Sequence, residues 1–454
     1  MNNMTTGSPL RKIIHFSIPL MIGNFFQLIY NMADTLIVGR KLGIDALAAI
    51  GMAGSLMFFI IGFAQGFTAG TAIPVAQAFG ARNYAKIQRS LIINIILNIM
   101  VSIILTLISI IYLKDILLLL QTPTDILPFA YEYLIIIFTC LSITVFFNMF
   151  SNLLRAIGNS RTPVAALAIG TTTNVILDIC FVIYLNMGVA GAAYATMISQ
   201  LLASFICIYV IHKDIPELHL NVNIKSLPLD EIKQHCYLGL PMGFQASIIA
   251  IGTVSISMAL NTLGPVAVAG YAAASKIDQI IILVLMSFGI AMATYVAQNF
   301  GAQEYERIII GIRKTIYLSV GISCISGIIL WFFGGKLSAL FGDGSSQALL
   351  EDYGNQFFHL TVPFYSLLGL LFIYRNALQG LNNSVIPTLA GILELIMRLV
   401  AAFVLTKHLG FAGTVISNPM AWLGALFALI PAYYAKEKQF KHILTHQNQK
   451  TITD

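Results

Sequence analysis

Long apolar segments separated by short polar ones run along the whole of this 454-residue chain. A helix needs about 20 apolar residues to cross a bilayer, whereas a strand of a membrane barrel needs only about 10. Twelve segments meet the helical requirement, at residues 13–38, 46–79, 88–113, 128–154, 163–185, 189–212, 235–262, 266–300, 308–333, 354–380, 386–406 and 412–435. The pattern therefore predicts an all-α polytopic membrane protein with twelve transmembrane helices.

Composition supports this interpretation. Hydrophobic residues make up 58% of the chain and charged residues only 10%, against about 25% charged in a typical soluble domain. The apolar segment after Arg11 and Lys12 lacks a small-residue cleavage site, so we expect a retained first span and not a removed signal peptide. The five cysteines form no CxxC or Cys/His pattern, which argues against a disulfide framework or a metal site. The net charge of +6 is carried by loop residues and does not point to nucleic acid.

Lys and Arg are distributed unequally between alternate loops. If the N-terminus is cytoplasmic, 17 of the 25 lie in cytoplasmic loops and tails or at the cytoplasmic ends of spans, 5 lie on the opposite side and 3 lie deeper within spans. Such an excess is typical of the cytoplasmic loops of membrane proteins. Both termini are therefore predicted to be cytoplasmic, which agrees with an even number of spans.

The two halves of the chain are internal repeats. Residues 75–84 match residues 296–305 at seven of ten positions, and the Asn-Ser-x-x-Pro run at 159–163 recurs at 383–387. We expect the glycines of the first motif, Gly80 and Gly301, to end a helix before a short turn. Two halves of six spans share one orientation, so an axis along the membrane normal relates them, with a substrate cavity between or within them. The predicted organisation is an N-terminal six-helix lobe at 1–212, a cytoplasmic linker at 213–234, a C-terminal six-helix lobe at 235–435 and a cytoplasmic tail at 436–454.

Each half also has a proline inside its first span, Pro19 and Pro241. A proline at such a position frees a backbone carbonyl and kinks the helix. A static kink in a packed bundle and a bend that changes between transport states both agree with the sequence. Pro19 and Pro241 are therefore candidate helix bends.

Two acidic residues fall within first-half spans, where an ionised side chain is costly and is therefore a candidate for function. Asp34 ends a polar stripe on one helix face, at positions i, i+3, i+4 and i+7, formed by Gln27, Tyr30, Asn31 and Asp34. Asp178 lies one turn after Asn174, so a carboxylate and an amide share a face. A solvated position near the outer interface is the alternative for Asp34. With no Lys or Arg near either acid in sequence, the pair suggests a cation or protonation site facing a cavity.

The charged residues within second-half spans are of mixed sign. Glu394 and Arg398 lie four residues apart and are expected to form a structural pair. We place Asp278 in the substrate cavity; the alternative is a pair with a base from a neighbouring helix, for which Arg375 is a candidate. No GxxxxGK[ST] motif occurs, so ATP is not expected to drive the protein.

Together these motifs resemble the multidrug and toxic compound extrusion family. The resemblance rests on the six-plus-six repeat, the Gln-x-x-Tyr-Asn-x-x-Asp run at 27–34 followed by Val38-Gly39, and the Val-Ala-Gln-x-Phe-Gly-Ala motif that begins at Val75. It also rests on residues 154–163, on Asn174-x-x-x-Asp178 and on the glycine- and alanine-rich stretch at 188–196, and it covers nearly the whole chain. The run at 272–278 is similar to that of a bacterial branch of the family.

The resemblance implies a V-shaped, two-lobed antiporter that spans the bacterial cytoplasmic (inner) membrane many times. Such a protein exports amphipathic, often cationic drugs in exchange for protons or sodium. It also implies a monomer in contact with membrane lipid, with no cofactor besides the coupling ion and with neither ATP nor nucleic acid as a partner.

The same resemblance assigns roles to particular residues. The family's coupling site corresponds to Asp34, Asn174, Asp178 and Thr196, and the oxygens of the last three would suit a sodium ion. The family's cavity corresponds to Pro19, Gln27, Tyr30 and Tyr133, and the positions of the other polar residues within spans add Asn31 and Asp278. Some members have an essential glutamate in the seventh span, but residues 239–261 contain no acid, which argues against a second-half site of that type.

Two other functions compete with export of drugs. A lipid-linked oligosaccharide flippase of the same superfamily would need a cavity suited to pyrophosphate, with several Arg or Lys in the first-half spans. These spans contain none apart from Arg89 at the cytoplasmic end of the third. A receptor or scaffold without transport is disfavoured by the repeat with its buried carboxylates.

Overall fold

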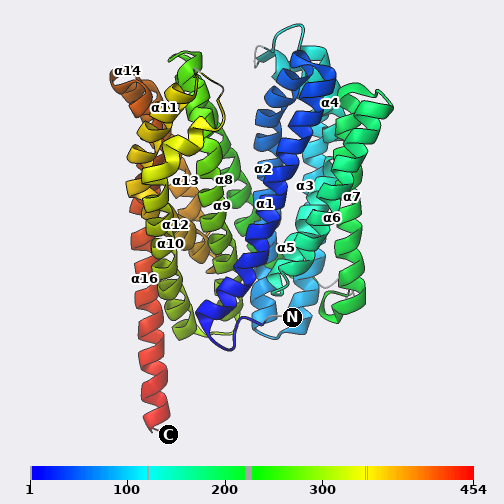
Figure 1. The fold of residues 1–454 in the computed structure, drawn as a ribbon. Helices are drawn as coiled ribbons and strands as arrows, with labels where there is room; N and C mark the ends of the chain where they lie inside the picture. The colour runs from blue at the N-terminus through cyan, green and yellow to red at the C-terminus, as the bar shows by residue number, and fades with distance from the viewer. Residues whose placement is uncertain (1–2, 120–121, 220–226, 343, 345, 454) are drawn as a thin grey trace. The chain divides into compact units, whose positions relative to one another are not determined.

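The computed structural model describes residues 3–119, 122–219, 227–342, 344 and 346–453, with side chains described outside 30–36, 44, 55 and 448–453. Within these residues the chain is helical and has no strand, which confirms the all-α prediction (Figure 1). The first half comprises α1 (Pro9–Leu42), α2 (Ile44–Gly80), α3 (Tyr84–Leu119), α4 (Leu127–Thr139), α5 (Leu141–Ala156), α6 (Arg161–Asp178), a π-helix (Ile179–Tyr184), α7 (Gly188–Asp214) and a 3₁₀ turn (Pro216–Leu218).

The second half repeats this order with additional breaks. It comprises α8 (Leu229–Asn261), α9 (Pro265–Gly301), α10 (Tyr305–Ala339), α11 (Ser346–Thr361), a 3₁₀ turn (Val362–Phe364), α12 (Tyr365–Gly380), α13 (Val385–Val400), a π-helix (Ala401–Leu405), α14 (Thr406–Leu409), α15 (Phe411–Val415) and α16 (Ser417–Thr453). Among the described residues, eleven helices are long and apolar enough to cross a membrane. The pair α4 and α5, bent by 50° at their junction, passes the same test when taken together, and counted as one span it gives the twelve that the sequence predicts.

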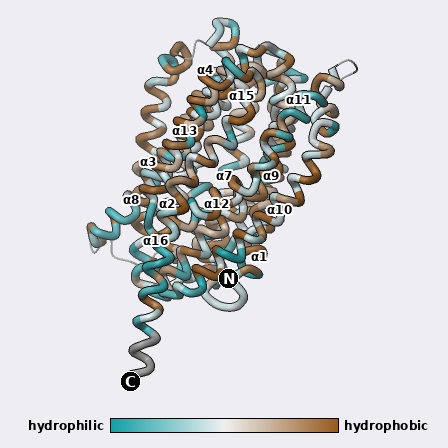
Figure 2. Tube along the Cα trace, turned by 90° about the vertical axis from the view of Figure 1, so that its left-hand side faces the viewer, coloured by the Kyte–Doolittle hydropathy of each residue, from teal (hydrophilic) through white to brown (hydrophobic). Residues whose placement is uncertain are grey.

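The surface of these helices is what a lipid environment requires. Hydrophobic residues cover most of their lengths in Figure 2, while hydrophilic residues gather near helix ends. Many large apolar side chains are exposed, including Phe332 at 68% and Phe427 at 76%. Soluble proteins rarely expose so much contiguous apolar surface, so the chain is a multi-pass membrane protein.

The repeat is visible at the helix ends. Gly43 and Gly264 precede α2 and α9 with φ angles of 90° and 92°, which L side chains rarely adopt, so each allows a sharp turn between long helices. At the other end, α2 stops at Gly80 and α9 at Gly301, where the repeated motif predicts it.

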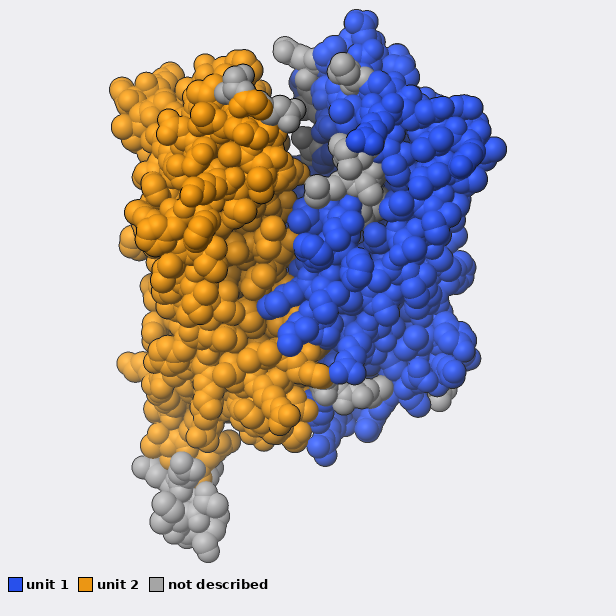
Figure 3. Space-filling model, in the orientation of Figure 1, with its two compact units in different colours: residues 1–3, 18–247 blue, residues 4–17, 248–454 orange. Residues whose placement is uncertain are grey.

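The chain packs into two compact units, which Figure 3 colours separately. Unit 1 consists of residues 1–3 and 18–247, and unit 2 of residues 4–17 and 248–454. The first part of α8 thus packs within unit 1, and the first part of α1 packs within unit 2. The lobe boundaries expected from the repeat stay a prediction.

Glycines allow α8 to approach α2 closely inside unit 1. A Cβ at Gly66 would lie 2.3 Å from the carbonyl oxygen of Met242, and one at Gly70 would lie 2.6 Å from that of Leu238. Such backbone contact is how helices associate in a membrane, where apolar side chains gain little by leaving lipid.

The N-terminal segment is held in unit 2 by the repeated motif of α9. The backbone N–H of Met4 donates to Gln298 Oε1 at 3.0 Å, and the Met4 carbonyl accepts from Asn299 Nδ2 at 3.2 Å and from Arg307 Nη2 at 3.1 Å. In unit 1 the matching glutamine, Gln77, accepts from Gln234 of α8 at 3.3 Å. The motif therefore fixes the segment that begins each half.

Candidate functional site

Asp178 is the last residue of α6 and lies in unit 1 against α7. Gly170 allows the two helices to meet, because a Cβ at this position would lie 3.2 Å from the carbonyl oxygen of Ser199. Asn174 and Asp178 follow at intervals of four residues and share the face that Gly170 presents to α7. Both side chains are buried, with 1% of Asn174 and 0% of Asp178 exposed.

Asn174 connects Asp178 to Thr196 of α7. With its amide nitrogen turned towards the carboxylate, Asn174 donates to Asp178 Oδ2 at 2.9 Å, and its oxygen accepts from the backbone N–H of Thr196 at 3.1 Å. Thr196 is 4% exposed. The structure therefore brings together three of the four residues expected at the coupling site.

A change in helical geometry begins directly after Asp178. The π-helix Ile179–Tyr184 continues α6, and a Cβ at Gly191 of α7 would lie 3.1 Å from the Cβ of Phe181 within it. Short π-helical turns occur frequently at functional sites. Unit 2 has a π-helix at the matching place, Ala401–Leu405 after α13.

Unit 2 contains a second buried carboxylate, that of Asp278 on α9, with 3% exposed. Tyr365 of α12 donates its hydroxyl to Asp278 Oδ1 at 2.6 Å, and the indole of Trp422 lies 6.5 Å from the Tyr365 ring. No Lys or Arg nitrogen of the described residues lies within 4.0 Å of the Asp278 carboxylate. The base expected as an alternative partner, Arg375, is therefore not paired with Asp278.

Arg375 pairs instead with Glu394 of α13, which also faces Arg398. The Arg375 Nη2 atom contacts Glu394 Oε1, while Arg398 Nη2 lies 3.9 Å from Glu394 Oε2. The pair of Glu394 and Arg398 predicted from their spacing thus exists at the limit of ion-pair distance, but the closer partner comes from another helix. The three side chains form a buried Arg–Glu–Arg cluster.

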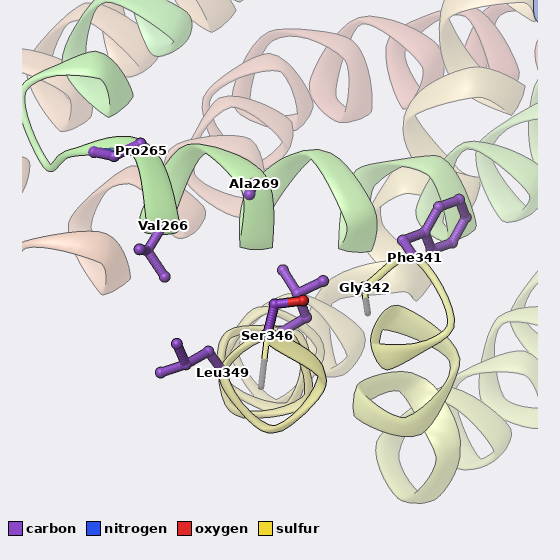
Figure 4. A pocket seen from close by; sticks show the side chains of 8 residues that line it. Pro265, Val266, Ala269, Phe341, Gly342, Ser346 and Leu349 are labelled. Carbon is purple, nitrogen blue, oxygen red and sulfur yellow. The ribbon is translucent and has the colours of Figure 1, made fainter. Parts of the chain in front are cut away.

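The structure also has an open pocket on unit 2, with a volume of about 420 Å³. Its lining consists of Pro265, Val266, Ala269, Phe341, Gly342, Ser346, Leu349 and Leu350 (Figure 4). None of the residues expected at the site lines it. The described part of the chain also contains no group of three or more His, Cys, Asp or Glu residues that could hold a metal ion.

The comparisons with known proteins decide the family. The MatE family model matches residues 19–180 and 241–404, well over half of the chain and both halves of the repeat. The chain belongs to the MatE family. MATE proteins are membrane transporters, so this chain is a transporter and not an enzyme.

Individual MATE relatives cover nearly the whole chain. The probable multidrug resistance protein YpnP of Bacillus subtilis is 28% identical over 382 residues, which is 83% of this chain and 84% of YpnP. The multidrug export protein MepA of Staphylococcus aureus is 23% identical over 436 residues, which is 95% of each chain. A crystal structure of MATE in complex with MaL6 has a TM-score of 0.89 at 22% identity and covers 97% of this chain and 99% of that one, so the fold is that of MATE transporters.

The remaining residues expected at the site of this MATE transporter are spread over unit 1. Gln27 of α1 is exposed, whereas Tyr133 of α4 is 3% exposed and packs in the hydrophobic core. Pro19 and Pro241 lie inside the continuous helices α1 and α8. The side chains of Tyr30, Asn31 and Asp34 lie outside the described part of the structure.

Sequence reasoning missed Tyr365 and the contact between Arg375 and Glu394. Tyr365 is 87 residues from Asp278 in sequence and belongs to a different helix, so no local spacing connects them. For Arg375 a signal existed, because a buried arginine in a span needs an acid, but two acids were available and the sequence does not choose between them.

Proposed function

We propose that this MATE transporter exports amphipathic, cationic small molecules across the bacterial cytoplasmic membrane, with both termini in the cytoplasm. Export proceeds by alternating access, in exchange for a cation that moves inward. The observation that carries the proposal is the buried cluster of Asp178, Asn174 and Thr196. The names of the relatives, a probable multidrug resistance protein and a multidrug export protein, support drugs as the substrate class.

Burial of Asp178 provides the coupling. A carboxylate inside a membrane helix bundle is expensive in its ionised form, so it takes up a proton, a metal ion or the positive charge of a substrate. A cationic drug that favours the ionised form of this site expels the proton, and a returning proton expels the drug. Competition for one negative charge therefore gives antiport.

Protons are our preferred coupling ion, and sodium is the alternative. Sodium is a hard cation that prefers oxygen ligands, and Asp178, Asn174 and Thr196 all carry such oxygens. To bind sodium beside the carboxylate, Asn174 would turn its amide, because its nitrogen faces Asp178 in the structure. Protonation needs only the carboxyl group, with Asn174 as its hydrogen-bond partner. We place Asp34 at the same site.

The residues expected from the sequence to contact substrate stay our proposal, namely Gln27, Tyr30, Asn31 and Tyr133 in unit 1 and, separately, Asp278 in unit 2. Asp278 adds a negative charge beside the aromatic rings of Tyr365 and Trp422, a combination that attracts organic cations. Pro19 and Pro241 are proposed to bend α1 and α8 between transport states.

Purified protein in liposomes tests the proposal with ethidium as the transported cation. A pH gradient and a sodium gradient are imposed separately, and dye movement is followed by fluorescence. We expect the pH gradient to move ethidium in the absence of sodium. If only the sodium gradient moves ethidium, protons are not the coupling ion, while the proposed coupling site at Asp178 still stands. Movement under neither gradient would refute export by antiport.

A further inference from the structure

Arg398 is a buried cation in the middle of a membrane span. It lies thirteen residues after the start and eleven before the end of the span Val385–Leu409, and it is only 7% exposed. A charged side chain at such a depth is rare and marks a functional group by default.

The protein does not satisfy this guanidinium. Arg375 contacts Glu394 directly, while Arg398 reaches the same carboxylate only at 3.9 Å through Nη2. Its Nε and Nη1 atoms have no hydrogen-bond partner among the described residues. Two arginines thus share one carboxylate, which leaves a local formal charge of +1. The two donors of Arg398, Nε and Nη1, are buried and in need of an acceptor.

The internal repeat shows that the fold itself does not require this charge. The buried positions of α6 and its repeat in unit 2 correspond at a constant offset of 224 residues, pairing Pro163 with Pro387, Ala166 with Ala390, Gly170 with Glu394, Asn174 with Arg398 and Asp178 with Ala402. In unit 1 a neutral asparagine occupies the position of Arg398 and packs with 1% exposed. The position that holds a neutral amide beside a carboxylate in unit 1 therefore holds an arginine one turn after a glutamate in unit 2.

The neighbouring helix leaves room for the arginine. A Cβ at Gly252 of α8 would lie 2.9 Å from Arg398 Cδ and 3.4 Å from Nη1. Glycine at this position thus leaves space for the Arg398 side chain against α8.

We propose that Arg398 binds the carboxylate of zwitterionic substrates. Nε and Nη1 lie on different edges of the guanidinium, so a substrate carboxylate would accept one charge-assisted hydrogen bond from either of them. Asp278 in the same unit supplies a negative charge for the positive end of such a molecule. The inference rests on the proposed export of organic cations and extends it to compounds that carry an acid group as well. Arg398 then determines specificity, and it is more than a counter-ion of Glu394.

Two dyes with one ring system test this directly. Rhodamine 110 has a free carboxylate, and rhodamine 123 is its methyl ester, so they differ in the group that Arg398 would recognise. Binding of each dye to the purified full chain is measured by fluorescence polarisation. The variants are Arg398→Gln, Arg398→Lys and, as a control, Lys276→Gln, which removes an exposed positive charge from α9.

We expect Arg398→Gln to weaken rhodamine 110 binding by about tenfold or more, as for loss of a charge-assisted hydrogen bond, with little change for rhodamine 123. Arg398→Lys should retain part of the preference, and Lys276→Gln should bind both dyes as the unaltered protein does. Retained rhodamine 123 binding shows that the variant is folded.

Equal effects of Arg398→Gln on both dyes, no effect on either, or failure of the unaltered protein to bind rhodamine 110 would overturn carboxylate recognition. If the unaltered protein binds rhodamine 110 but not the ester, the proposed export of simple cations fails while the role of Arg398 stands.

Discussion

Glu394 holds together two buried guanidiniums, so its neutralisation is expected to destabilise unit 2 strongly. The exposed fractions of the side chains of Glu394, Arg375 and Arg398 are 4%, 8% and 9%. Glu394→Gln preserves size and leaves both arginines without a carboxylate. Removal of one partner from a buried ion pair costs about 3–5 kcal/mol, because the remaining charge stays buried and uncompensated.

Intrinsic fluorescence provides the assay. Both tryptophans of the chain, Trp331 and Trp422, belong to unit 2, so their emission reports unfolding of this unit during denaturant titration in detergent. Glu306→Gln is the control, since Glu306 is exposed on α10 and surface substitutions usually change the free energy of unfolding by less than about 0.5 kcal/mol.

A second substitution checks the cause. Addition of Arg398→Gln to Glu394→Gln removes one of the two unpaired charges, so part of the lost stability should return. A Glu394→Gln variant within about 1 kcal/mol of the unaltered protein would refute the reasoning, because the buried-pair penalty would then be absent. From the sequence alone, Glu394 and Arg398 form a self-contained pair, and the variant with both Glu394→Gln and Arg398→Gln is predicted to retain most transport. In the structure Arg375 also depends on Glu394, so we expect this double variant to be partly destabilised.

Three further predictions concern the site, the packing and the topology. Asp178→Asn should abolish ethidium export from cells without loss of folded protein, and we expect the same of Asp34→Asn. The control Asp115→Asn, at an exposed position of α3, should export ethidium normally. Normal export by Asp178→Asn would show that Asp178 is not part of the coupling site. Gly70→Ala should lower stability by about 1–3 kcal/mol, because its Cβ would overlap the carbonyl oxygen of Leu238. The control Gly54→Ala, whose Cβ would meet nothing within 4 Å, should not lower stability. An equal loss of stability in both variants would contradict the proposed contact between α2 and α8. A single cysteine introduced at Asn221, outside the described residues, in a cysteine-free variant should not be labelled when intact cells are treated with a membrane-impermeant thiol reagent. Labelling would show that this linker lies outside the cell and that the predicted orientation is wrong.

The sequence by itself determined the membrane class, the twelve spans and the repeat. Lipid requires long apolar helices whose backbone hydrogen bonds are all internal, so the spans can be read directly from residue order. It also placed Asn174 beside Asp178, since residues four apart share a helix face. The resemblance to a known family supplied Thr196, which the fold brings to the same cluster.

Only the tertiary structure decided which helices supply the partners of buried charges. Tyr365 reaches Asp278, and Arg375 reaches Glu394, across helices that are distant in sequence. Residue order fixes neighbours within a helix but not the rotation and depth at which two helices meet, which small residues such as Gly70 and Gly170 set through backbone contact. The contact of Arg375 with Glu394, which leaves the guanidinium of Arg398 without full hydrogen bonding, therefore follows only from the packing of the helices.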